Sequence, residues 1–600
     1  MSGTLASAVL RLGRWLQSHS FGFTPEQIGV NEGLRAATAV SLMVVSASLT
    51  GDTLFAWGAF AAFWTCLADP SGPVRRRLYT MGGFILTGTV VGPLMSCSAG
   101  LGPWAVTPLL FLVVGLCNMA RLFGPEAGQA GMLASVVAVV SVEQPAHLSQ
   151  APALAVMFLI GGALAVFICA AIWPIHPFQP ARRALKAVFR ELGHMAAALE
   201  AGGHEHTSNR SAARTAIERA RAQVDKTAAA RHQGPVQREL LAVIEAADEI
   251  FAGLIALEHA CVARRMSVPA ALLAPLRQAL ALAGQQALHR QAAWGRVHPY
   301  TEALAQQAAI AEGLVSRVAA LWAHALGRIA VADAQALAGP RTRTGTAHAK
   351  PSRSAMRAAL RHGLRVAMVV LAAYIVTKAL AVPYAYWATM AVVVVMQPLA
   401  ETTWPRMLER VAGSVAGGFS AAALTLVLTT PLEQVLFVFP LAALTIALRT
   451  VNYTLFTFFL TPLFVLVADM VTPGHGWGLA FDRAGCNVLG SVLGALGCLF
   501  LWREHQARPF SALLADAEAA NHAYAAIVLP PEATLEAVEA ARRAAGIASV
   551  AAEEALQRQM LEGRPRGQAL SAAAEQLAAL RRLAGAAAVA WLESGSTLRP

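Results

Sequence analysis

Charged side chains are scarce in this chain of 600 residues: Asp, Glu, Lys and Arg make up 14% of it, whereas 56% of its residues are hydrophobic. Soluble domains usually carry about a quarter charged residues. The shortage therefore excludes an ordinary cytosolic enzyme and a disordered chain. It is concentrated in two apolar blocks, residues 34–175 and 356–503. We therefore predict an all-α, polytopic membrane protein.

Several signatures of chemistry are also missing. The seven cysteines are scattered without the spacing of a disulfide framework or a metal site, which excludes a secreted disulfide protein. No G-x-x-x-x-G-K-[ST] phosphate loop occurs, so the sequence does not predict ATP-driven pumping. His204-Glu205-His206 lacks the H-E-x-x-H spacing of a zinc site and is interpreted as a solvated loop. We predict no metal, no cofactor and no enzymatic activity.

Charged residues, Gly and Pro divide each apolar block into about six segments. A spanning helix needs ~20 apolar residues, and several segments are shorter, so we predict ten to twelve spans. The segments are 34–50, 54–68, 79–97, 103–120, 127–143, 153–173, 362–381, 384–398, 408–429, 433–449, 453–471 and 484–502.

Basic residues near the span ends predict the orientation. With a cytoplasmic N-terminus, ten of them flank the inner side of the first block and nine that of the second, and only Lys378 and Arg483 fall outside. Lys and Arg accumulate on the cytoplasmic side of membranes. We therefore predict a multi-pass inner-membrane protein, surrounded by lipid, with both termini cytoplasmic. The bias explains much of the net charge of +12 without a nucleic-acid partner. Asp482 and Arg483 are interpreted as an interface feature opening the last span.

Three regions outside the apolar blocks are expected in the cytoplasm. Residues 1–33 predict an amphipathic segment on the membrane face. Residues 176–355 predict about five helices and a tether, and residues 504–600 about four helices. These helices could stabilise a homo-oligomer, gate the inner mouth or bind a partner, and the sequence does not choose among these roles.

The two apolar blocks align at an offset of 330 residues. Gly33-Leu34-Arg35 falls on Gly363-Leu364-Arg365, and Trp57 falls on Trp387. Arg76, Gly83 and Gly88 also meet identical residues at this offset. Six spans per half, both starting inside, predict a parallel repeat, each copy followed by a cytoplasmic helical region. In repeated transporters the substrate path lies between the halves; the alternative is a self-complementary interface alone.

The second block carries a recognisable set of residues: Trp387, Gln397-Pro398, Arg406, Arg410, Gly413, Asn452-Tyr453 and the Thr461-Pro462 break. In this order the chain resembles the fusaric acid resistance (FUSC) family, which includes aromatic acid exporters. The resemblance implies export of aromatic carboxylates from the inner membrane, driven by the proton gradient, often beside a periplasmic adaptor protein. A related plant group, the aluminium-activated malate transporters, suggests an anion-conducting alternative.

Two sets of residues are candidates for binding the substrate. Arg121 and Arg449 end the fourth span of each half, with Asn118 and Asn452 nearby, and a guanidinium matches a carboxylate. The alternative is that both arginines snorkel to the headgroups. Trp57 and Trp387 begin the second spans and could stack on an aromatic substrate, or could belong to an aromatic belt.

Three carboxyl groups are candidates for proton coupling: Asp69, Glu126 and Asp469. Burial could raise the pKa of any of them, whereas Asp69 and Glu126 could instead cap helices or pair with Arg75, Arg76 or Arg77. We expect a proton-coupled exporter of small, aromatic organic anions. A passive anion channel and a non-transporting envelope scaffold are the alternatives.

Overall fold

The computed structural model describes twelve segments of the chain. They are residues 28–70, 72–174, 176–202, 207–227, 234–333, 352–396, 400–428, 430–471, 476–501, 508–528, 534–561 and 568–594. Every regular element in these segments is a helix, which confirms the all-α prediction. The predicted amphipathic segment lies almost wholly outside the described residues, as do His204-Glu205-His206, Gln397-Pro398 and most of the predicted tether.

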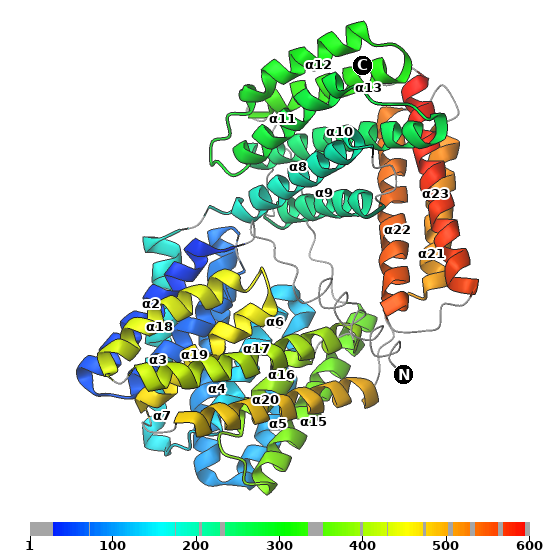
Figure 1. Cartoon of the computed structure of the whole chain (residues 1–600). Helices are drawn as coiled ribbons and strands as arrows, with labels where there is room; N and C mark the ends of the chain where they lie inside the picture. Colours follow the sequence, from blue (N-terminus) through cyan, green and yellow to red (C-terminus); the bar gives the residue numbers. More distant parts are fainter. Residues whose placement is uncertain are drawn as a thin grey trace. The chain divides into compact units, whose positions relative to one another are not determined.

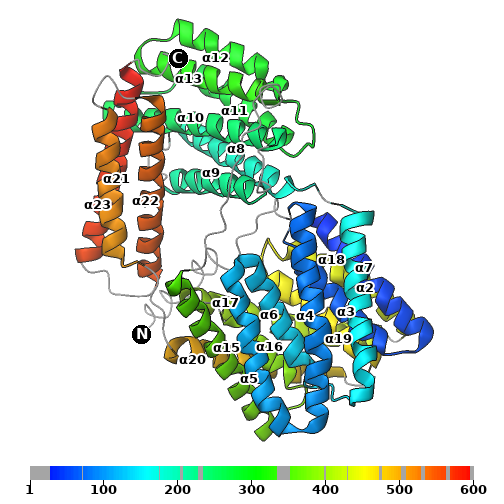
Figure 2. The same ribbon diagram turned by 180° about the vertical axis from the view of Figure 1, so that it is seen from behind.

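The chain forms two compact units, and each combines segments that are far apart in sequence. Residues 1–175 and 348–506 form the first, called here the membrane unit; residues 176–347 and 507–600 form the second, the helical unit. Figures 1 and 2 show the helices of both units from opposite sides.

The membrane unit has six α-helices in each half of its described part. The first half comprises α2 (Val30–Thr50), α3 (Leu54–Leu67), α4 (Val74–Leu101), α5 (Pro103–Met119), α6 (Pro125–Ser141) and α7 (Ala151–Phe167), with the 3-10 turns η2 (Ala120–Phe123) and η3 (Leu148–Gln150) and the π-turn η4 (Ile168–Ile172). The second half comprises α15 (Arg353–Ala379), α16 (Tyr386–Val395), α17 (Ala400–Val427), α18 (Pro431–Leu448), α19 (Tyr453–Val471) and α20 (Gly476–Phe500).

Seven helices in the described residues are long and apolar enough to cross a membrane, and four shorter apolar helices accompany them. The short ones include α3 and α16, which occupy the same place in each half. Ten of the fourteen residues of α3 and nine of the ten residues of α16 are buried. A helix that is hydrophobic all round is either a core helix or a membrane span, and the burial of nearly all residues of α3 and α16 inside the unit identifies both as core helices. These two helices therefore form the centre of the unit.

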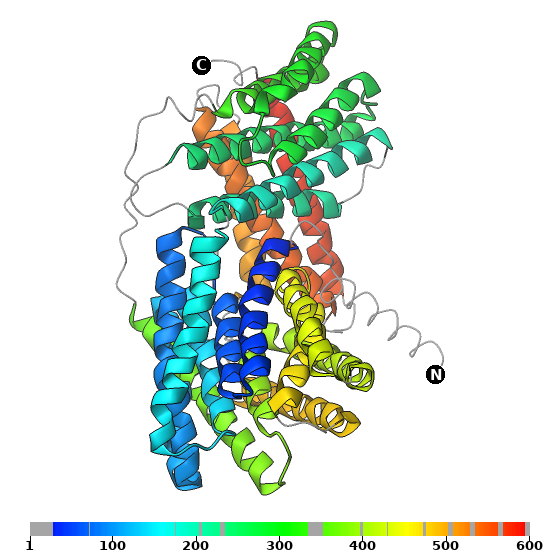
Figure 3. The same cartoon turned by 90° about the vertical axis from the view of Figure 1, so that its left-hand side faces the viewer.

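The halves pack in corresponding ways. The first helix of each half contacts the fourth helix of the other, as α2 against α18 and α15 against α5; Figure 3 shows the dark blue α2 beside the yellow α18. Within each half the second and sixth helices touch, as α3 with α7 and α16 with α20.

Close approach of backbones occurs at glycines in equivalent positions. A Cβ added at Gly161 of α7 would overlap the carbonyl oxygen of Gly58, and one at Gly490 of α20 would overlap that of Ala388. Gly58 and Ala388 are themselves 330 residues apart. Small residues permit such contacts between membrane helices. The correspondence supports the predicted repeat.

The helical unit has a main apolar core built from both soluble regions of the sequence, and a smaller apolar cluster within residues 517–580. It contains α8 (Gln179–Glu200), α9 (Thr207–Thr227), α10 (Pro235–Arg264), α11 (Ala270–Gln286), η5 (Trp294–Val297), α12 (His298–Ile310), α13 (Gly313–Ala330), α21 (Phe510–Val528), α22 (Leu535–Leu561) and α23 (Gln568–Glu593). The described parts thus hold six and three α-helices where about five and four were expected. Helix α10 contacts α23, and α22 contacts α9.

Candidate functional site

A cavity of about 560 Å³ lies in the membrane unit between α3, α16 and α19. Its wall is rich in aromatic rings, because the three apolar helices face one another there. The aromatic residues that line it are Trp57, Phe60, Phe63, Tyr384, Tyr386, Trp387 and Phe464. Small-molecule sites in proteins are typically apolar cavities of roughly 300–1,000 Å³, so this cavity has the size and the character of a ligand site.

The two predicted tryptophans line this one cavity from opposite halves of the chain. Trp57 is 6% exposed and Trp387 is 3% exposed, and their burial inside the unit is unlike that of an interfacial belt. Neither indole N–H has a hydrogen-bond partner among the described residues. Phe464 connects them: its ring lies 6.3 Å from that of Trp387 and 6.1 Å from that of Phe60, which stacks on Trp57 at 5.0 Å.

The polar rim of the cavity joins the two halves by an ion pair. Glu143, which follows α6, is the one carboxylate among the residues that line the cavity. It lies 3.1 Å from the ammonium group of Lys378 in the last turn of α15. Lys378 is about half exposed and Glu143 is one-fifth exposed. A pair that is this exposed holds the two helices together weakly.

A buried arginine stands behind the cavity wall. The guanidinium carbon of Arg483 lies 3.5 Å from the centre of the Trp387 ring, and the residue is 2% exposed. Its Nε and Nη1 atoms have no hydrogen-bond partner in the described part of the chain. Sequence reasoning missed this residue because it began the last span at residue 484. The helix in fact starts at Gly476, which places Arg483 inside it.

The predicted arginines and asparagines lie elsewhere. Arg449 donates to the carbonyl oxygens of Leu67 and Asp69, at 2.9 and 3.3 Å, and so caps the end of α3. Leu67 is ten residues from Trp57, which is about 15 Å along a helix. The structure thus brings the two tryptophans together, but it places Arg449 at the other end of α3.

The remaining members of that set also make local contacts. Asn118 donates to the hydroxyl of Ser135 at 3.0 Å, which joins α5 to α6. The Asn452 side chain accepts from the backbone N–H of Leu455 at the start of α19. Arg121 lies in η2, and η2 contacts α15.

Asp69 belongs to a buried ion-pair cluster in the loop after α3, outside every candidate span. Its carboxylate accepts two hydrogen bonds from Arg77, at 2.6 and 2.8 Å, and one from Arg35 at 3.3 Å. Both arginines also donate to the carbonyl oxygen of Cys169 in the π-turn η4. Burial alone raises the pKa of Asp69, but the hydrogen bonds and charge of Arg77, followed by the charge of Arg35, hold this pKa below its usual value. The geometry thus favours the ion-pair interpretation of Asp69.

The other two candidates for proton coupling are Glu126 and Asp469. Glu126 forms an ion pair with Arg76 at 2.5 Å, and both side chains are partly exposed. Asp469 lies near the C-terminal end of α19, but its side chain is outside the part of the structure that is described. Among the described residues, no group of three or more His, Cys, Asp or Glu side chains could hold a metal ion.

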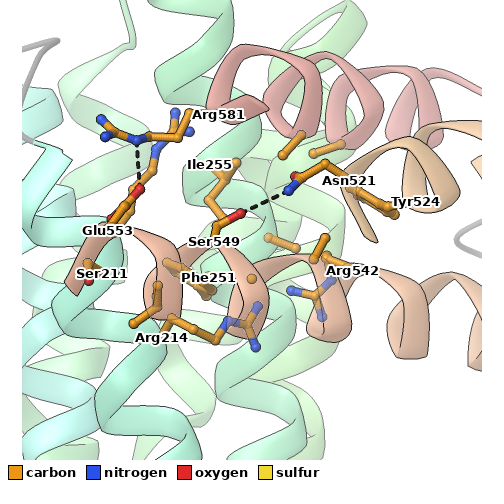
Figure 4. A pocket seen from close by; sticks show the side chains of 17 residues that line it. Ser211, Arg214, Phe251, Ile255, Asn521, Tyr524, Arg542, Ser549, Glu553 and Arg581 are labelled. Carbon is orange, nitrogen blue, oxygen red and sulfur yellow. Dashed lines mark hydrogen bonds and ion pairs between the residues drawn. The ribbon is translucent and has the colours of Figure 1, made fainter. Parts of the chain in front are cut away.

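A second, smaller cavity lies in the helical unit, where α9, α10, α21, α22 and α23 meet (Figure 4). It holds about 80 Å³ and four arginines line it. Each of these arginines has a carboxylate partner: Arg210 pairs with Glu258, Arg581 with Glu553, and Arg214 and Arg542 with Asp248. All four guanidinium groups of this cavity are thus paired with carboxylates and not available to bind a ligand. The larger cavity of the membrane unit is therefore the stronger candidate site.

The comparisons with known proteins concern the same part of the membrane unit. Residues 371–497 match a family model described as fusaric acid resistance protein-like. The match runs from within α15 to within α20 and therefore includes Trp387, Phe464 and Arg483. No curated protein and no solved structure matches the chain.

Proposed function

We propose that this protein, whose second membrane half carries a fusaric acid resistance protein-like domain, exports small aromatic organic acids across the bacterial inner membrane, driven by the proton gradient. The family domain and the apolar helices support a membrane transport protein. The observation that carries the finer proposal is the cavity itself. Trp57 and Trp387, equivalent residues of the two halves, line it together.

The lining of the cavity suits a planar, apolar substrate. Aromatic rings prefer offset-stacked or edge-to-face contacts with other rings, at centroid distances of about 4.5–7 Å. A benzene ring between two indoles and Phe464 would make such contacts, and the mostly apolar wall would bury its faces. Because the wall comes from both halves, a movement of one half against the other would open and close the site, as in other transporters with repeats.

Proton coupling needs a carboxyl group that can gain and lose a proton near the substrate. Asp69 and Glu126 are held by arginines, so each would first have to leave its ion pair. Glu143 joins Asp469 as a candidate, because it lines the cavity and its pair with Lys378 is partly exposed. With the orientation that the basic residues predict, Glu143 lies toward the periplasm, where protons enter.

Everted membrane vesicles provide the test. An imposed pH gradient should drive uptake of radiolabelled benzoate, and an uncoupler should abolish it. The double variant Trp57→Ala, Trp387→Ala should lower the initial rate about tenfold or more, since each indole contributes ring contacts worth about 1 kcal/mol. Trp104→Ala, at a residue that is 74% exposed, is the matched control. Uptake that is unchanged by the uncoupler, or by the double substitution, would contradict the proposal.

A passive organic-anion channel is the second candidate, because the buried cation Arg483 would attract a permeating anion equally well. Voltage-clamped bilayers distinguish the two functions. A channel gives steady unitary currents in benzoate without any pH gradient, whereas a proton-coupled exporter gives none.

A further inference from the structure

The least compensated charge in the described membrane helices is that of Arg483 in α20. No carboxylate oxygen of the described residues lies within 4 Å of its guanidinium, since no ion pair includes it. Asp482, its neighbour in sequence, does not pair with it. Removing a charge from water without a partner costs several kcal/mol, and such residues in membrane segments usually serve a function.

Arg483 is the first of three buried polar residues on one face of α20. Asn487 and Ser491 follow at intervals of four residues, which places all three on one side of the helix. Each is at most 2% exposed. The Oδ1 of Asn487 and the Oγ of Ser491 also lack hydrogen-bond partners in the described structure. Helix α20 contacts α16, the helix that carries Trp387, so this polar face lies in the interior of the unit.

Arg483 lies next to the cavity wall, and so connects the polar face of α20 to the cavity. Its guanidinium lies against one side of the Trp387 ring at 3.5 Å, and Trp387 is part of the cavity wall. A ring face attracts a cation through its quadrupole but leaves the net charge in place. The guanidinium therefore keeps its full capacity to attract an anion in a region of low dielectric constant, where that attraction is strong.

We infer that Arg483 binds the carboxylate of the transported acid, with Asn487 and Ser491 extending the polar face along α20. This inference rests on the proposed function. It restricts the substrate to acids with one carboxylate beside an apolar ring, because the cavity wall is aromatic and Arg483 lies directly behind Trp387 in that wall. Arg483 does not itself line the cavity, so the Trp387 ring has to move aside for the carboxylate to reach the guanidinium. A planar guanidinium binds a carboxylate through two parallel hydrogen bonds, which an ammonium group cannot reproduce.

Binding to the purified full-length protein tests this role directly. Equilibrium dialysis would compare benzoate with benzyl alcohol, its uncharged counterpart of similar shape. For Arg483→Gln we expect benzoate binding to weaken about tenfold or more, since a charge-assisted pair is lost, while benzyl alcohol binding stays within about twofold. Arg483→Lys should fall between, and Arg75→Gln, at an exposed residue of α4, should match the wild type.

Thermal unfolding in detergent separates binding from a structural role. Because Arg483 lacks a carboxylate partner, its replacement by Gln should leave the melting temperature unchanged or raise it. A large drop together with loss of both ligands would show that Arg483 supports the fold, and would overturn the inference. Equal benzoate binding by the wild type and Arg483→Gln, or no benzoate binding by the wild type, would overturn it too.

The vesicle assay distinguishes this failure from failure of the proposed function. Benzoate binding that depends on Arg483, without proton-driven uptake, would refute the exporter and keep the anion site. Proton-driven uptake that is unaffected by Arg483→Gln would keep the exporter and refute the site.

Discussion

The two halves of the membrane unit share their backbone packing but differ in how they neutralise buried arginines. In the first half, Arg35 and Arg77 share the carboxylate of Asp69. In the second half, Arg483 lies on the ring of Trp387, and Arg410, which is 3% exposed, donates to the hydroxyl of Tyr453 at 3.3 Å. Neither of these two arginines has a carboxylate within 4 Å among the described residues.

The difference suggests that the two halves of the membrane unit have different roles. The single carboxylate of Asp69 offsets part of the positive charge of Arg35 and Arg77. The hydrogen bonds of this cluster also tie α2, α4 and the π-turn η4 together. Aromatic groups contact Arg483 and Arg410 but leave the charge of these two arginines uncancelled. We therefore assign stability to the first cluster and anion attraction to the second. The following substitutions test this contrast, beginning with the largest expected effect.

Asp69→Asn should cause the largest loss of stability. It leaves Arg35 and Arg77 buried without a carboxylate, and removing one partner of a buried pair costs about 3–5 kcal/mol. The free energy of unfolding in detergent, measured by denaturant or heat, checks this. The contrast between the halves predicts that Arg483→Gln has no such effect. Similar losses for both variants would remove the distinction.

The pH dependence of the Asp69 cluster follows from the sign of its shift. The pKa of Asp69 is lowered in the folded protein. Its stabilising contribution is therefore fully present above its usual unfolded pKa of about 3.9, and is lost as the pH falls through the lower folded value. The melting temperature of Asp69→Asn should stay below that of the wild type from about pH 5 to pH 8 by a constant amount. A difference that disappears within this range would mean that Asp69 titrates there.

Gly161→Ala and Gly490→Ala test the packing that the halves share. Each new Cβ would overlap a carbonyl oxygen of the facing helix, and overpacking typically costs about 1–3 kcal/mol. The two losses should be similar, because the contacts are equivalent. Gly82→Ala is the control, since a Cβ there meets no atom within 4 Å. Unequal losses would mean that the halves differ in packing as well as in charge.

The sequence predicted most of this architecture because its signals were local or repeated. Apolar runs located the twelve α-helices that the structure describes in the membrane unit, and the offset of 330 residues placed Trp57 and Trp387 in equivalent positions. The sequence did not predict that the two soluble regions share one apolar core. That association depends on contacts such as the one between α10 and α23, for which helical periodicity gives no signal.

The sequence predicted the candidate site only in part, because contacts between helices far apart in the chain leave no local pattern. The equivalent positions of Trp57 and Trp387 in the two halves marked them as candidate site residues. No pattern showed that Arg449 would reach the carbonyl oxygens at the end of α3. The charged pair Asp482-Arg483 predicts a membrane boundary, whereas the structure places Arg483 inside α20. The helix begins at Gly476, eight residues before the predicted start of the span, and no sequence pattern marked that position.

Asn487→Asp would remove the contrast by placing a carboxylate beside Arg483 on the polar face of α20. The new group would lie one helical turn from Arg483 and compete with the substrate for the guanidinium. Proton-driven uptake of benzoate should fall about tenfold, the effect of about 1.4 kcal/mol of lost binding, while stability is kept or raised. Asn487→Ser removes the amide without adding a charge, so comparing the two variants separates the effect of the new carboxylate from that of losing Asn487. Full uptake by Asn487→Asp would argue against an anion site at Arg483.

Glu126→Gln should have the smallest effect, and it tests whether burial is what makes the first cluster important. Glu126 pairs with Arg76 at 2.5 Å, a distance as short as any in the Asp69 cluster, but the two side chains are 26% and 39% exposed. Water and salt screen such a pair, so its loss should cost at most about 1 kcal/mol, and less in high salt. Unfolding of this variant and of Asp69→Asn would be compared at low and high NaCl. A loss for Glu126→Gln as large as that for Asp69→Asn would mean that the number of ion pairs, rather than their burial, stabilises the first half.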